Sequence, residues 1–389
     1  MSRHLSVSLA CIAFCFATSS NAFAANTTPT LQDAVTAAVQ PTMTQQGIPG
    51  LAVVIHEHGQ RHYFNYGVAS KVTGQPISAD TLFEIGSVSK LYGATLAAYA
   101  ATTGKLSLSS PVSRYVPQLA GSAFDHITVL QVGGYVAGGL PMQFPESVTD
   151  DAGALQWLNQ WKPTWKPGIR RVYSNPSIAL LGMAAAGSLQ QPCNEAIERT
   201  LTTGLQLRQT WVDVPAAQQA NLAQGHNEHG EVPHHHYPAC AGSWGALKTS
   251  STGLMDFLEA QLNPGKLTPD WQRAIGITQT GWYRTPLMLQ GLGWEIYPWP
   301  VAQSRIVPGN SSQMSARANA VRLVSQPQRA TRSNLLNKTG GTNGFSSYVL
   351  LLPERDIAIA LLANKSDWPR EERVHAALTI LRALDTQPH

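Results

Sequence analysis

The segment at residues 83–90, followed by a helix-forming and largely apolar run at 91–100, constrains the fold of this chain most. The apolar side chains of that run predict a buried helix, with Ser87 at or just before its first turn. Residues i and i+3 are neighbours on a helix surface, so Lys90 is expected beside Ser87, near the positive end of the helix dipole. Burial and nearby cations lower the pKa of an amine, and a neutral lysine can take a proton from a serine hydroxyl. Because Ser-x-x-Lys is short, an ordinary solvated helix start is the alternative.

Two further motifs follow in order, Tyr173-Ser174-Asn175 and Lys338-Thr339-Gly340. Ser-x-x-Lys with Ser-Asp-Asn and Lys-Thr-Gly is typical of class A β-lactamases and penicillin-binding proteins. With tyrosine opening the middle motif, and with these long spacings, the sequence resembles the class C, cephalosporinase-type serine β-lactamases. The likeness covers nearly the whole mature chain, including residues 46–50, 115–117, 137–141, 338–345 and 363–365.

Residues 1–24 are typical of a secretory signal peptide. Arg3 and His4 form a short positive start, residues 5–16 are mostly apolar, and Ala22-Phe23-Ala24 is an A-x-A cleavage site. No later stretch approaches about 18 uninterrupted apolar residues, so no membrane anchor is expected. The sequence therefore predicts an exported protein, located in the periplasm of a two-membrane bacterium.

The charge of the chain indicates which classes of partner it can bind. The chain has 27 basic and 23 acidic residues without a basic cluster, so no nucleic-acid partner is expected. We expect a monomer that binds a small molecule.

Cys193 and Cys240 are the cysteines left after processing, and an oxidising compartment permits a disulfide between them. Two buried free thiols are the alternative, since sequence does not give the Cα separation that a bridge requires.

Strand-like segments occur at both ends of the mature chain, at 51–57, 62–66, 346–352 and 357–363. Helical patches lie between them, at 152–160, 177–188, 194–201 and 253–261, and terminal helices are predicted at 31–43 and 373–384. This order predicts an α/β domain in two parts, 25–105 and 302–389, interrupted by a helical domain at 106–301. The resemblance implies the same α/β (α+β) fold: a mixed, mainly antiparallel sheet flanked by helices, a mainly helical second domain, and the active site between them.

The resemblance assigns the catalytic roles. Ser87 would be the nucleophile that opens the β-lactam amide, and it needs a base within hydrogen-bond reach. Lys90 and Tyr173 are both candidates, because the ammonium groups of Lys90 and Lys338 favour the anion of the phenol. A phenol and a lysine so placed titrate as a unit, so the base stays unassigned between them. The backbone amides of Ser87 and Gly341 would stabilise the oxyanion.

The resemblance also assigns substrate contacts. Asn175 and Gln143 match the positions that hold the acylamino side chain of the substrate, because an amide both donates and accepts hydrogen bonds. Lys338 and Thr339 match the positions that face the substrate carboxylate. Tyr135 matches an aromatic at the cleft edge, although packing between a loop and a helix explains it equally well.

The chain departs from the family pattern in two places. Trp244 stands where the family usually has a tyrosine lining the side-chain pocket. A family asparagine near the substrate carboxylate has no clear counterpart at 366–372, and Arg373 is the candidate for the arginine that follows it. The histidines at 226, 229 and 234–236 lie among Asn, Gly and Pro residues, as in an exposed loop, and zinc ligands need fixed spacing. No metal or cofactor is expected.

The motifs together predict a serine β-lactamase that hydrolyses cephalosporins and penicillins through an acyl-enzyme on Ser87, and so confers β-lactam resistance. The main alternative is a D-alanyl-D-alanine carboxypeptidase or related penicillin-binding enzyme, which differs in deacylation speed. An esterase of the same fold is a second alternative, but such relatives often lack Lys-Thr-Gly. A β-lactam sensor would stop at the acyl stage, and its mark would be a transmembrane or signalling segment.

Overall fold

The computed structural model describes residues 30–234, 237–327 and 329–385, together with Met1. Apart from Met1, the expected signal peptide lies outside the described residues. Within the described ranges, no helix has both the length and the apolar character needed to cross a membrane.

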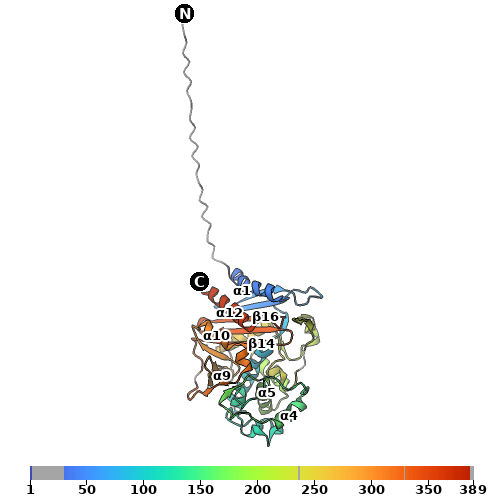
Figure 1. The fold of residues 1–389 in the computed structure, drawn as a ribbon, viewed down its shortest axis with the longest axis vertical. Helices are drawn as coiled ribbons and strands as arrows, with labels where there is room; N and C mark the ends of the chain where they lie inside the picture. Colours follow the sequence, from blue (N-terminus) through green and yellow to red (C-terminus); the bar gives the residue numbers. More distant parts are fainter. Residues whose placement is uncertain (2–29, 235–236, 328, 386–389) are drawn as a thin grey trace.

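A nine-stranded antiparallel sheet forms the upper part of the molecule in Figure 1. Its long central strands come from the two ends of the chain, as the sequence predicts. In spatial order the strands are β13 (Arg322–Leu323), β9 (Tyr283–Arg284), β10 (Leu289–Gln290), β11 (Glu295–Pro298), β14 (Asn334–Gly341), β15 (Ser346–Leu352), β16 (Ile357–Ala363), β1 (Gly50–Glu57) and β2 (Gln60–Gly67).

The centre of this sheet is covered on both faces, which explains its nearly continuous apolar strands. Successive side chains of a strand point to opposite faces, so Leu51 and Ile55 of β1 join one core with helices α1 (Leu31–Gln46) and α12 (Arg370–Leu384). Ala52 and Val54 of the same strand join the larger core on the other face. α1 and α12 lie together above the sheet in Figure 1.

The terminal helices extend beyond their predicted limits. α1 continues through Pro41 to Gln46 and ends at Gly47, which adopts a left-handed conformation with φ of 60°. α12 begins at Arg370, three residues before the predicted start. That earlier start brings Arg370 into the first turn of the last helix.

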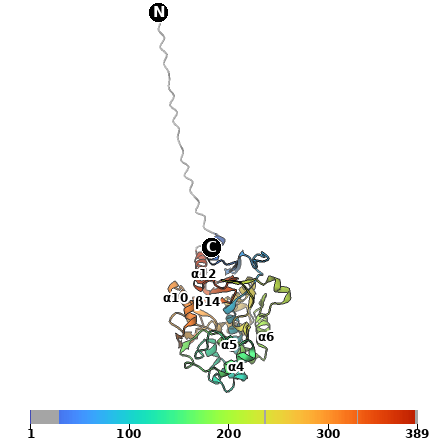
Figure 2. The same cartoon turned by 45° about the vertical axis from the view of Figure 1, so that its right-hand side comes forward.

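The second lobe is mainly helical and lies below the sheet in Figure 1; Figure 2 shows the same two layers from another side. Its central helix α5 carries almost entirely buried apolar side chains and packs against α2. Helices of this lobe and of the lower sheet face are α2 (Ser89–Thr102), α3 (Val129–Gly133), α4 (Asp151–Gln160), α5 (Asn175–Leu189), α6 (Cys193–Glu195), α7 (Thr202–Gly204), α8 (Ser251–Leu262) and α9 (Pro269–Thr278). Two short helices, α10 (Gln303–Gly309) and α11 (Ser312–Ala316), follow strand β11.

The main sheet also takes strands β9, β10 and β11 from residues 283–298, which the sequence assigned to the helical domain. The expected boundary at 301 therefore falls after sheet strands have already begun. β9 and β10 contain two residues each, too few to show an alternating pattern, and glycines at 281, 291 and 293 interrupt the segment. The division into two domains itself stays a prediction.

Candidate active site

Ser87 lies in a single turn of 3-10 helix, Gly86–Val88, between the short strand β3 (Leu82–Glu84) and helix α2. β3 is held in a small sheet with β8 (Lys248–Ser250) and β5 (Thr210–Trp211). Gly86 has φ of 49°, a conformation that side chains other than glycine's rarely adopt. This tight turn presents Ser87 at the start of a buried helix, as predicted.

Lys90 is completely buried and directs its amine at Ser87. Its Nζ donates to Ser87 Oγ at 2.9 Å, to Asn175 Oδ1 at 2.6 Å and to the carbonyl oxygen of Trp244 at 2.7 Å. Burial and the charge of Lys338 lower the pKa of Lys90 to about 8, against the opposing effect of Tyr173. The amine can therefore lose its proton near neutral pH.

Tyr173 lies between two lysine side chains. Its ring centroid is 5.2 Å from Lys90 Nζ and 5.1 Å from Lys338 Nζ. Burial raises the pKa of Tyr173, but the charges of Lys338 and Lys90, with a hydrogen bond to Ser87, outweigh it and lower the pKa to about 7. The residue directly precedes the N-cap of α5, where Ser174 Oγ accepts from the Ser177 amide at 3.1 Å. The helix start fixes the direction in which the phenol leaves the backbone.

Strand β14 supplies the opposite side of the site. Lys338 is 2% exposed and donates to the Thr339 carbonyl oxygen at 2.8 Å. Thr339 and Gly341 follow toward the end of the strand. Gly340 and Gly341 pack so closely on the turn before α2 that a Cβ on Gly340 would contact the Ile85 carbonyl oxygen. The absence of side chains at Gly340 and at Gly86 lets the strand and the serine turn meet.

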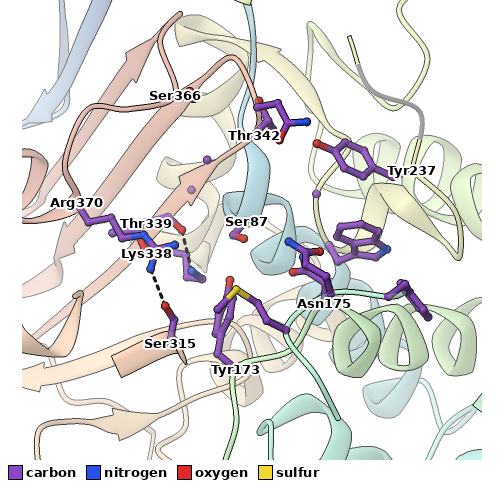
Figure 3. A pocket seen from close by; sticks show the side chains of 18 of the residues that line it. Ser87, Tyr173, Asn175, Tyr237, Ser315, Lys338, Thr339, Thr342, Ser366 and Arg370 are labelled. Atoms are coloured by element: carbon purple, nitrogen blue, oxygen red, sulfur yellow. Dashed lines mark hydrogen bonds between the residues drawn. The ribbon is translucent and has the colours of Figure 1, made fainter. Parts of the chain in front are cut away.

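These residues surround a cavity of about 890 Å³ between the sheet and the helical lobe. Figure 3 shows Ser87 and Tyr173 in its middle, with Lys338 and Thr339 on one side and Asn175 on the other. Eight of the ten residues singled out from the sequence line it: Ser87, Gln143, Tyr173, Asn175, Trp244, Lys338, Thr339 and Gly341. Lys90 lies directly behind Ser87, within hydrogen-bond distance.

The helical side of the cavity carries a chain of amide contacts. Asn175 accepts from Lys90 and donates to Gln143 Oε1 at 2.7 Å. Gln143 is exposed and lines the cavity. Trp244 is 4% exposed and its Nε1 donates to the Ala239 carbonyl oxygen at 3.0 Å, which fixes the indole as a wall.

Tyr135, expected either at the cleft edge or as packing between a loop and a helix, lies in the interior of the structure. Tyr135 is 2% exposed, does not line the cavity, and lies behind Tyr173 with 5.0 Å between ring centroids. Its backbone has φ of 63° after the short helix α3, and its ring meets the Arg171 guanidinium at 5.1 Å. This left-handed turn places the ring in the interior.

Several cavity residues were not predicted from the sequence. Arg171 Nε donates to Gln290 Oε1 at 2.8 Å, and its Nη2 pairs with Glu295 Oε1 at 3.3 Å beneath Tyr173. Arg171 stands two before Tyr173 in an extended segment, so its presence on the same side could have been inferred from strand periodicity. Arg370 and Ser315 also line the cavity and are hydrogen-bonded to each other. No local pattern signals this contact between residues far apart in sequence.

Cys193 and Cys240 form a disulfide with a Cα separation of 5.1 Å, which decides between the two alternatives. The bridge joins α6 to the segment that leads to Trp244.

Of the described histidines in the tract, His229 and His234 are exposed as expected, whereas His226 is not. His226 is 2% exposed, and its Nδ1 lies 3.2 Å from the Asn364 carbonyl oxygen. His234 contacts Glu84 Oε1 at 2.7 Å. Among residues that the structure describes, no three His, Cys, Asp or Glu side chains gather as metal ligands would.

Comparison with known proteins identifies relatives along nearly the entire chain. The family model described as Beta-lactamase matches residues 35–384. A beta-lactamase of Pseudomonas fluorescens is 44% identical over 355 residues, which cover 91% of this chain and 99% of that protein. A solved structure of a beta-lactamase/D-alanine carboxypeptidase from Pseudomonas syringae has a TM-score of 0.88 and 38% identity, covering 92% of this chain and 99% of its own. A class C beta-lactamase from Rhodobacter sphaeroides has a TM-score of 0.85 and 34% identity, covering 91% and 99%.

Proposed function

Because this chain belongs to the beta-lactamase family, we propose that it hydrolyses cephalosporins and penicillins through an acyl-enzyme on Ser87. The observation that carries the proposal is the contact of Ser87 Oγ with a buried lysine amine at 2.9 Å, beside a tyrosine flanked by two lysines. A nucleophile with a base in hydrogen-bond reach and a lowered base pKa is what covalent catalysis requires.

In acylation, Ser87 Oγ attacks the β-lactam carbonyl carbon while the Lys90–Tyr173 pair takes the hydroxyl proton. The carbonyl carbon–nitrogen bond then breaks, and the proton passes to the ring nitrogen. The two groups share their charge, so the proton belongs to the pair rather than to one residue. Tyr173 lines the cavity and Lys90 does not, which makes the phenol the group that reaches the leaving nitrogen.

The amides of Ser87 and Gly341 are proposed as the oxyanion donors. Support comes from the close packing of the Gly86 turn on Gly341, which brings both backbones to the same end of the cavity. A donor fixed on a developing oxyanion contributes about 3 kcal/mol to the barrier reduction.

In deacylation, water attacks the ester carbonyl carbon as the same pair removes its proton. The bond to Ser87 Oγ breaks, and the hydroxyl regains a proton from the pair. During both steps, Lys338 and Thr339 hold the ring carboxylate, while Asn175 and Gln143 hold the acylamino group. Trp244 forms the wall beside that group.

A D-alanyl-D-alanine carboxypeptidase is the second candidate, because one solved relative is named a beta-lactamase/D-alanine carboxypeptidase. The two activities share the acylation step and differ in how fast water releases the acyl group. We further propose that the protein is exported to the periplasm by its signal peptide and acts there as a monomer. The leader-like sequence at 1–24 supports export.

Time-resolved mass spectrometry of the purified enzyme mixed with a cephalosporin, alongside substrate absorbance, tests this function. Rapid substrate loss with a short-lived adduct on Ser87 is expected. A persistent adduct with little turnover would instead indicate a penicillin-binding peptidase. Ser87→Ala should form no adduct, and full turnover by that variant would refute the nucleophile assignment.

A further inference from the structure

Some of the charged residues that line the cavity form ion pairs with each other, and others do not. They are Glu146, Arg171, Glu295, Lys338, Arg370 and Arg373. Arg171 and Glu295 neutralise each other in a buried ion pair. Among the described residues, neither Lys338 nor Arg370 forms an ion pair with a carboxylate. These two cations therefore face the cavity without a protein anion.

Arg370 reaches the cavity from the first turn of α12. One turn later, Arg373 donates to the carbonyl oxygens of Gly340 and Ser347, at 2.9 Å for the latter. These bonds fasten the start of α12 to the ends of β14 and β15. Arg370 consequently stands on the side of the cavity that carries Lys338 and Thr339, as Figure 3 shows, and away from Asn175.

Within the described part of the chain, one side chain accepts a hydrogen bond from the guanidinium of Arg370. Its Nη1 donates to Ser315 Oγ at 2.7 Å, and Ser315 belongs to the short helix α11, which also lines the cavity. A guanidinium has five N–H donors, so one neutral acceptor leaves most of them unused. Arg370 is half-buried, and its positive charge acts on Lys90 and Arg373. Repulsion among these cations is relieved when an anion binds between them.

We propose that Arg370 is a specificity-determining residue, which favours β-lactams that carry a second negative charge beside the ring carboxylate. The inference rests on the proposed function, in which Lys338 and Thr339 take that carboxylate. One carboxylate offsets one cation, and Arg370 remains to pair with a further anionic group on the same side of the ring. Planar guanidinium groups bind carboxylates through two parallel hydrogen bonds, which gives direction as well as charge.

The test compares two cephalosporins with the same ring and acylamino group. Their substituents on the ring carbon next to the carboxylate-bearing carbon have equal size, one ending in a carboxylate and the other in a carboxamide. The measured quantity is the ratio of kcat/KM for the anionic substrate to kcat/KM for the neutral one. This ratio does not depend on the fraction of folded enzyme, since both substrates report on the same active molecules.

We expect Arg370→Ala to lower this ratio about tenfold, as one desolvated charge pair is lost. Arg370→Lys retains the charge and should keep the ratio within about threefold of the wild-type value. Arg382→Ala is the matched control, because it removes an exposed arginine from the same helix, and it should leave the ratio unchanged.

An unchanged ratio in Arg370→Ala would overturn the proposal. Equal loss on both substrates would overturn it too, because the guanidinium would then act on the carboxylate that both share. Failure of the wild-type enzyme to hydrolyse either substrate would count against the proposed function instead, so the two failures are distinguishable.

Discussion

Gly86 and Gly341 approach so closely that a Cβ added to Gly86 would collide with the backbone nitrogen, carbon and oxygen of Gly341. The first residue forms the turn before Ser87, the proposed nucleophile, and the second ends strand β14. The contact joins two segments that lie at opposite ends of the chain. It sets the separation between the two backbone amides proposed to bind the oxyanion.

Gly86→Ala is therefore expected to abolish most activity and to destabilise the fold. Gly47→Ala is the matched control, because Gly47 also has a positive φ, 60°, but nothing lies within 4 Å of the position that a Cβ would take there. Left-handed strain alone costs about 1 kcal/mol. We expect Gly47→Ala to lose about that much unfolding free energy and to keep kcat/KM, as measured by denaturant unfolding and steady-state kinetics. Equal activity of the two variants would show that the contact has no catalytic consequence.

The residues proposed to be catalytic could be singled out from the sequence because their motifs are local. A serine and a lysine three apart meet on a helix, and Lys338-Thr339-Gly340 is a run of three consecutive residues that the family resemblance singles out. Two of the long central strands could also be predicted, since 346–352 and 357–363 are rich in β-forming residues and flank one turn. In both cases, the signal lies within a few consecutive residues.

What the sequence did not reveal depends on contacts between distant segments or on backbone conformation. Arg370 enters the cavity because α12 starts earlier than its apolar pattern and because Arg373 binds the end of β14. Tyr135 turns inward because its φ is positive, which no propensity predicts for a tyrosine. Strands of two residues, such as β9, are too short to show a sequence pattern and are defined by hydrogen bonds to neighbouring strands of the sheet.

The pH dependence of acylation should follow the Lys90–Tyr173 pair. The charges of Lys338 and Lys90 outweigh burial and lower the pKa of Tyr173 to about 7, while burial and the charge of Lys338 lower that of Lys90 to about 8. Below about pH 7 the pair gains a proton and loses its basic function, so kcat/KM should fall about tenfold per pH unit on the acid side. Steady-state kinetics across pH 5–9 measures this limb. A flat profile down to pH 5 would exclude the pair as the base.

Asn175→Asp should move this limb to higher pH. Asn175 Oδ1 lies 2.6 Å from Lys90 Nζ, so a carboxylate there would raise the pKa of Lys90 and hold it protonated. Asn175→Ala removes the same hydrogen bonds without adding charge, and it serves as the control. We expect a shift of the limb by about one pH unit or more with aspartate and a smaller one with alanine. If the acid sides of the two pH profiles were identical, the charge at position 175 would have no effect on Lys90.

His56 links the sheet to α8 through a charge-dependent contact. Its Nδ1 lies 2.9 Å from Glu259 Oε1, and its Nε2 lies 3.3 Å from Asp356 Oδ2. The hydrogen bond to Glu259 raises the pKa of His56, against the effect of burial. Burial raises the pKa of Glu259, but hydrogen bonds from His56 and Arg61 outweigh it and lower the pKa to about 2.

These shifts predict when the contact stabilises the fold. The contribution of His56 is fully present below about pH 6.5 and is lost as pH rises through its raised pKa, while that of Glu259 is lost as pH falls from about 4.5 toward 2. The Tm difference between wild type and His56→Gln should be largest near pH 5–6 and shrink at pH 8. His375→Gln, which changes an exposed histidine on α12, is the control and should show no such trend. A pH-independent difference for His56→Gln would mean that packing, not charge, explains its effect.

The Cys193–Cys240 disulfide should stabilise both the fold and the Trp244 wall. It closes a loop with a sequence separation of 47, for which constraint of the unfolded chain contributes about 2–4 kcal/mol. Cys240 also begins the turn that leads to Trp244, whose carbonyl oxygen accepts from Lys90. Cys193→Ser with Cys240→Ser should therefore lower the Tm by several degrees. It should also reduce kcat/KM most for substrates with a bulky acylamino group.

Thiol treatment of the wild type should reproduce the Tm loss, with mass spectrometry showing whether the bridge is intact. If the double variant unfolds at the wild-type temperature, the bridge contributes nothing to stability, and the wall is held by the indole hydrogen bond to Ala239 instead.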